Sequence, residues 1–157
     1  MNPQEIADAL EQYRAGLETA VSLLKQLRDV AARQHAGTAA RDFAALAADS
    51  DTRDRLTGAL VAIEPGMRDV RAALANEHVS LQGRPDYEDV LALRQTAADL
   101  VSTILETDKA SMQALADAEL ARKAAMAGLD AGETTLAAYR RVLSPPVGSA
   151  SVLDIRG

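Results

Sequence analysis

The side chains that could do chemistry are few and scattered along this sequence. The two histidines, His35 and His78, stand alone, since neither has a second histidine or an acid four residues away. A zinc site on a helix needs two ligands at that spacing, so we expect both histidines to be solvated. The sequence contains no cysteine, which excludes disulfides, thiolate nucleophiles and cysteine-ligated zinc.

Two other patterns could suggest a binding site. The first is an acidic run that comprises Asp42, Asp49, Asp51 and Asp54. It lacks the regular alternation and the closing glutamate of a calcium loop, and arginines interrupt it. We expect it to form a solvated helix face. Gly128 and Gly132 are isolated glycines and do not make a phosphate-binding loop. Because no nucleophile with a base, metal cluster or carboxylate pair emerges, we expect no metal, no cofactor and no enzymatic activity.

Charge and hydropathy narrow the classes of partner. The formal net charge is −6, with acids and bases interspersed, which disfavours binding to nucleic acid or to an anionic membrane. No apolar run approaches the roughly 18 residues of a membrane span. The amino terminus lacks the basic start and apolar run of a signal peptide. We therefore expect a cytoplasmic protein with no direct membrane contact.

Composition and apolar spacing predict an all-α fold. The chain has 33 alanines but one phenylalanine and no tryptophan, so its core must be thin, as between closely packed helices. Steps of four and three residues predict helices over about 3–35, 39–75 and 87–143. The first of these has the clearest stripe: Ile6, Leu10, Tyr13, Leu17, Ala20, Leu24, Leu27 and Ala31. We expect one domain over residues 1–143, an antiparallel bundle or coiled coil of about three long helices, and an extended, mobile tail over 144–157.

The second predicted helix contains two irregularities. Its apolar stripe fades between Asp49 and Arg55, and it then crosses Pro65 and Gly66. A proline inside a helix costs roughly 3 kcal/mol. Because the stripe keeps its phase from Leu56 to Leu74, we predict a kink near Pro65 rather than a reversal of direction, and Pro65 can restart the helix there.

The third predicted helix has an imperfect stripe. Asp108 and Arg122 fall in the same heptad class as Val101, Leu115 and Leu129. We expect both charges to reach the edge of the seam, rather than to form a buried pair or a partner contact. Met112 and Met126 are adaptable enough to receive an incoming amphipathic helix, but core packing is the favoured interpretation.

One family shows a similar pattern. The stripe of the last helix and the end of the chain carry Ile104, Leu105, Asp108, Leu115, Leu129, Gly132, Leu136, Tyr139, Pro145, Pro146, Ser151, Leu153, Asp154 and Gly157, and the second segment carries Asp42, Phe43, Leu46, Arg55 and Leu60. This pattern resembles the flagellar type III export chaperones of the FlgN and FliT kind. The Pro65–Gly66 interruption and the weak stripe from Asp49 to Arg55 depart from that family.

The resemblance implies a chaperone for hook-associated flagellar proteins that binds their amphipathic terminal helix and delivers them to the export gate. It implies that Tyr139 contacts the export gate, although the same residue lies within reach of the seam. For client binding we single out Met126, Leu129, Leu136 and Leu143 together with Tyr139. The alternative is a structural or scaffolding coiled coil that self-associates, for example as a homodimer.

Overall fold

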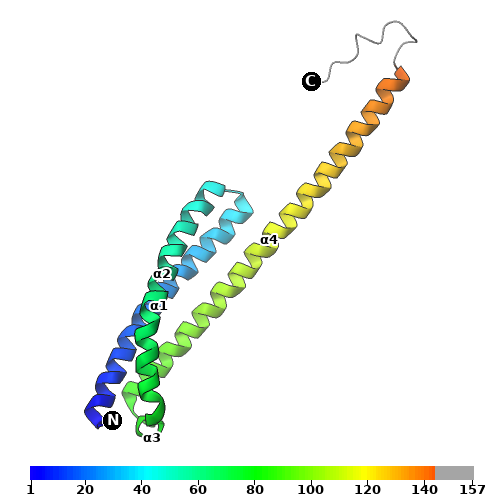
Figure 1. Cartoon of the computed structure of the whole chain (residues 1–157). Helices are drawn as coiled ribbons and strands as arrows, with labels where there is room; N and C mark the ends of the chain where they lie inside the picture. The colour runs from blue at the N-terminus through cyan, green and yellow to red at the C-terminus, as the bar shows by residue number, and fades with distance from the viewer. Residues whose placement is uncertain (144–157) are drawn as a thin grey trace. The chain divides into compact units, whose positions relative to one another are not determined.

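The computed structural model describes the backbone of residues 1–143 and the side chains of residues 1–130 and 137. The predicted all-α fold is confirmed, since the described residues form helices and no strand (Figure 1). The helices are α1 (Pro3–Ala40), α2 (Phe43–Leu74), the 3-10 turn η1 (Ala75–Glu77), α3 (His78–Leu81) and α4 (Pro85–Leu143). The predicted tail, 144–157, lies outside the described residues.

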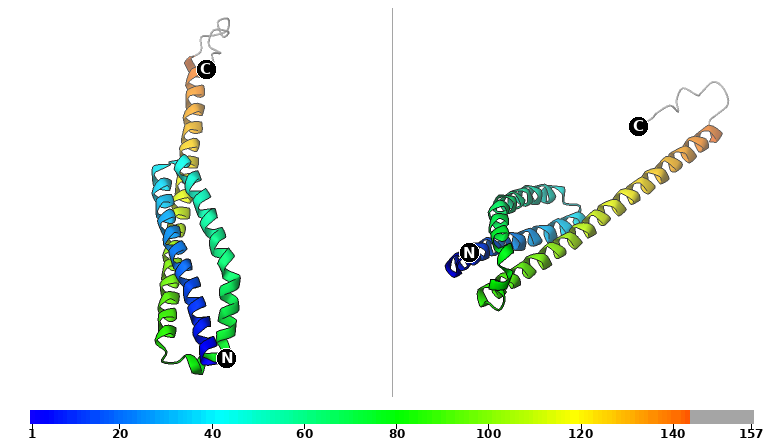
Figure 2. Two further views of the ribbon diagram at one scale, coloured as in Figure 1. Left: turned by 90° about the vertical axis from the view of Figure 1, so that its left-hand side faces the viewer. Right: turned by 60° about the horizontal axis from the view of Figure 1, so that its bottom comes forward.

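The chain divides into two compact units where one domain over residues 1–143 was predicted. The first unit spans Met1–Ala114 and the second Leu115–Gly157, so the division falls within α4. In the first unit, α1, α2 and the first half of α4 form a bundle in which successive long helices run in opposite directions (Figure 2).

Helix α1 begins where the sequence predicts. Asn2 accepts a hydrogen bond from the Glu5 N–H at 2.8 Å, and the Glu5 carboxylate accepts one from the Asn2 N–H at 2.6 Å. This reciprocal cap satisfies two amides that have no partner inside the helix. The end differs, because α1 continues past Gly37 to Ala40 and closes at Arg41 in the left-handed region, φ 55°. Gly37 instead permits close approach, since a Cβ there would lie 3.2 Å from Leu46 of α2.

The core of the first unit consists of two clusters along α1. The lower one lies near the amino terminus: Ile6, Leu10, Tyr13, Leu17, Val70, Leu74, Leu81 and Val90. The upper one lies toward the α1–α2 turn: Val21, Leu24, Leu27, Val30, Ala31, Leu56, Leu100 and Ile104. The α1 stripe predicted from sequence is buried throughout, which confirms its register.

Helix α2 contributes few residues to this core. Only Leu56, Val70 and Leu74 of its 32 residues are buried, and the stretch from Asp49 to Arg55 makes polar contacts instead. The helix is continuous through Pro65 and bends along its length (Figure 2). A reversal of direction at Pro65 is therefore excluded, and the kink itself stays a prediction.

The connection to α4 is partly helical rather than a loop. Leu81 of α3 is buried in the lower cluster, and Gly83 turns the chain at φ 74°, a conformation that suits glycine. Helix α4 begins at Pro85, two residues before the predicted start. Arg84 and Asp86 pair beside this start, and hydrogen bonding to Arg84 lowers the pKa of Asp86 below its ordinary value.

Candidate functional site

An apolar groove opens in the first unit where α2 bends. Proline has no N–H, so Pro65 leaves the carbonyl of Val61 without its helical partner, and the proline ring crowds the preceding turn. At this level α2 lies away from the other two helices, and the space left is about 560 Å³. That volume is within the range of ordinary ligand pockets, roughly 300–1,000 Å³.

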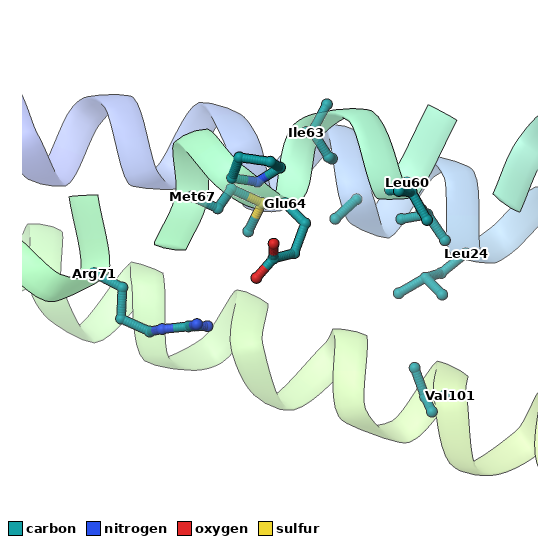
Figure 3. Close-up of a pocket in the computed structure, with 10 residues that line it drawn as sticks. Leu24, Leu60, Ile63, Glu64, Met67, Arg71 and Val101 are labelled. Carbon is teal, nitrogen blue, oxygen red and sulfur yellow. The ribbon is translucent and has the colours of Figure 1, made fainter. Parts of the chain in front are cut away.

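The three long helices of the first unit, α1, α2 and α4, all contribute to the groove (Figure 3). Ala20 and Leu24 come from α1, and Val101 comes from α4. Helix α2 supplies the remaining lining residues: Leu60, Val61, Ile63, Glu64, Pro65, Met67 and Arg71. Small residues on α1 explain the space, since Ala20 cannot reach far enough to fill the gap beside the bend. The groove thus lies between the lower and the upper core clusters.

Glu64 and Arg71 are the charged residues of this lining (Figure 3). Glu64 makes only a long ion pair with Arg68 of its own helix, 3.9 Å, and both side chains are more than half exposed. Arg71 has no hydrogen bond or ion pair with any described residue. The groove therefore combines an apolar lining with one acid and one base that are free to meet a partner.

A polar layer lies above the upper core cluster. The Arg53 guanidinium of α2 donates to both carboxylate oxygens of Asp108 on α4 and, over 3.0 Å, to the side-chain oxygen of Gln34 on α1. Hydrogen bonding to Asp108 raises the pKa of Arg53 above its ordinary value. His35 contacts the Ser111 hydroxyl at 3.1 Å beside this layer. Three helices are thus joined by one arginine.

This layer corrects the interpretation of Asp108. The sequence pattern favoured a charge that reaches solvent at the edge of the seam, but Asp108 forms a half-buried pair with Arg53. The partner comes from the stretch of α2 where the apolar stripe fades. The sequence did contain a signal for this pair. Asp108 interrupts the apolar stripe of one helix, and Arg53 lies where the apolar stripe of another helix fades.

The ion pair gives a testable contribution to stability. Replacing Asp108→Asn removes the charge but keeps the shape, and we expect the free energy of unfolding to fall by about 1 kcal/mol, because a two-point contact between helices is lost. Glu119→Gln is the matched control, since its arginine partner, Arg122, lies on the same helix and both side chains are solvated. Thermal or urea unfolding should show a loss for Asp108→Asn alone. Equal effects of the two changes would mean that the pair does not join the helices.

The second unit presents apolar side chains on a helix. Among the described side chains of this unit, four large ones are exposed: Leu115 (49%), Leu120 (66%), Met126 (49%) and Leu129 (67%). In the first unit, Val101, Leu105 and Met112 of α4 are exposed as well. The core face of α4 runs instead through Val90, Leu100 and Ile104. Core packing, the favoured interpretation for Met112 and Met126, is therefore wrong in both cases.

The predicted client-binding residues fall into two groups. Met126 and Leu129 are exposed on the helix of the second unit. Helix α4 extends to Leu143, but the side chains of Leu136, Tyr139 and Leu143 lie outside the described residues. Between Leu115 and Met126, Arg122 pairs with Glu119 at 2.8 Å. Hydrogen bonding between them lowers the pKa of Glu119 and raises that of Arg122.

The described residues form neither a metal site nor a membrane span. No three histidine, cysteine, aspartate or glutamate side chains among them gather closely enough to hold a metal ion. Among the same residues, no helix carries an apolar stretch that could cross a bilayer.

Known proteins give no further guide. Comparison with protein-family models found no family that matches this chain, and comparisons with curated proteins and with solved structures found no significant match.

Proposed function

We propose that this chain is an export chaperone that binds the amphipathic terminal helix of a hook-associated flagellar protein. The observation that carries the proposal is the helix of the second unit, where Leu115, Met126 and Leu129 are about half exposed or more. Large apolar side chains that gather on one face of a helix and remain in water are typical of a protein-binding surface.

The spacing of these side chains suits a helical partner. Met126 follows Leu115 by 11 residues and Leu129 follows it by 14, which are close to three and four turns. The three side chains therefore share one face over about 21 Å of helix. A client helix with leucines at a matching spacing would bury this face by packing its own apolar stripe against it. The flexible thioether of Met126 adapts to clients of different shape.

The first unit has a different part in this proposal. Its two core clusters and the Arg53 layer hold three helices together, so it folds around its own core. The second unit supplies the face that needs a partner. Delivery of the client to the export gate, with Tyr139 as the contact, belongs to the same proposal and derives from the family resemblance.

A titration tests the proposal. Synthetic peptides that span the terminal amphipathic helices of hook-associated proteins should bind the full chain with a 1:1 stoichiometry and gain helical circular dichroism on binding. A peptide of the same composition with its apolar residues spread around the helix is the control. If none of the amphipathic peptides binds more tightly than its control, the proposal fails.

A further inference from the structure

The groove of the first unit places charges in a definite order over an apolar lining. Along α2, the acid Glu64 comes first and the base Arg71 follows seven residues later, two turns of the helix. Both side chains line the groove and extend from α2 into the space beside α4 (Figure 3). A helix that filled the groove would need apolar side chains on one face and, along one edge of that face, a base and an acid two turns apart.

The second unit carries a segment with this pattern. Met126 and Leu129 supply the apolar side chains, and both are exposed. Lys123 and Asp130 are also seven residues apart. Lys123 precedes Met126 by three residues and Asp130 follows it by four, so both lie along the same edge of the helix face that carries Met126. Residues at these spacings are neighbours on a helix surface. In this segment the base precedes the acid, which is the complement of the order on α2.

We propose that the groove of one copy receives the helix of the second unit from another copy of this chain. Lys123 then lies opposite Glu64 and Asp130 opposite Arg71, so the incoming helix runs parallel to α2. Met126 and Leu129 insert between α2 and α4 of the host, against Leu24, Val61 and Val101.

The proposed assembly is a closed dimer. In it, two copies exchange helices about a two-fold axis, so that each groove and each helix has a partner. Burial of apolar side chains from both partners drives the association. The charge pairs fix direction and register, because a helix inserted in the opposite direction would place like charges together.

Self-association and client binding then use the same face of the second unit. A client helix competes with the groove for Met126 and Leu129, so a bound client shifts the dimer toward monomer. The dimer itself does not depend on the proposed function, since it involves only surfaces of this chain.

The mass of the chain in solution, measured across concentrations without any client, is the first test. We expect a monomer–dimer equilibrium. Glu64→Lys and Lys123→Glu should each raise the dimer dissociation constant about tenfold, since an attraction becomes a repulsion, and the double variant should return toward the original value. Glu11→Lys, the same charge change on the exposed face of α1, should have no effect. The proposal would be overturned if the chain stayed monomeric, or if the double variant dimerised more weakly than either single variant.

Cysteine pairing locates the contact. Because the chain has no cysteine, a Val61→Cys chain mixed with a Met126→Cys chain should form a mixed disulfide on mild oxidation. Val79→Cys, equally exposed at 71% but on α3, should form far less with the same partner. If the chain dimerises but Val61→Cys forms no more mixed disulfide than Val79→Cys, the dimer uses another surface and the inference is refuted. A stable dimer without client capture would refute only the proposed function, and a client-binding monomer would refute only the dimer.

Discussion

A chain with Leu129→Asp is expected to bind a client helix about 100-fold more weakly than the unchanged chain. Leu129 is the most exposed large apolar residue described in the second unit, at 67%, and it shares a face with Leu115 and Met126. In the proposed complex this side chain is buried, so aspartate loses the apolar contact and places a carboxylate without a partner against the client. Together these effects amount to roughly 3 kcal/mol, which is about 100-fold in the dissociation constant.

The second unit contains a matched control. Leu120 is 66% exposed and lies nine residues before Leu129, which is two and a half turns and therefore the opposite face. Leu120→Asp makes the same chemical change on the same helix, and we expect the affinity to stay within about twofold because this side remains in water. Fluorescence or calorimetric titration of one client peptide into each variant distinguishes the two. Similar losses for both would argue against binding on one face.

Leu10→Ala is expected to lower the free energy of unfolding of the first unit by about 3 kcal/mol. Leu10 is 1% exposed and lies in the lower core cluster with side chains from α2, α3 and α4. Removing its branched end loses the transfer free energy of the buried carbons and leaves a cavity that three long helices cannot readily collapse around. The melting temperature should fall by about 10 °C.

Urea unfolding followed by circular dichroism measures this loss. Leu105→Ala is the matched control, because it is the same substitution at a side chain that is 61% exposed on α4. We expect it to change the free energy of unfolding by no more than about 0.5 kcal/mol. A small effect of Leu10→Ala would mean that the lower cluster is loosely packed and that the first unit is not the rigid part of the chain.

The fold followed from the sequence where one helix face is uniformly apolar. Ile6 to Ala31 carries leucines and other apolar residues at an unbroken spacing, so only one face of α1 can be buried, and the structure buries it. The boundary between α1 and α2 was harder. Gly37 is a common helix terminator, but here it gives room for Leu46, a long-range contact that local sequence does not reveal.

The register of α4 was predicted only in part. The predicted stripe included Val90 and Ile104, which are buried, but it also included Val101, Leu105 and Met112, which are exposed, and it left out the buried Leu100. Alanines on both faces of α4 leave several phases with similar apolar content, and packing against the leucines of α1 decides between them. The shift leaves Val101, Leu105 and Met112 in water. The groove could have been anticipated from Pro65 on one helix and Ala20 on another, but only the fold brings them together.

The exposed face of the second unit was predicted only at Met126 and Leu129. Their spacing placed them on one stripe, but a stripe does not say whether a neighbouring helix covers it. That depends on where α1 and α2 end. The upper cluster closes with the Arg53 layer near Asp108, so the chain beyond it carries apolar side chains without the core residues that cover Val90 and Leu100.

Hydrogen–deuterium exchange of the full chain, with and without a client helix, tests the central claim most directly. Amides on a helix with little buried apolar surface open readily and exchange fast. At concentrations where the chain is monomeric, we predict that the client slows exchange over residues 115–143 and leaves the core helices of the first unit unchanged. Protection confined to residues 60–71 and to the neighbouring part of α1, with none beyond residue 115, would contradict it.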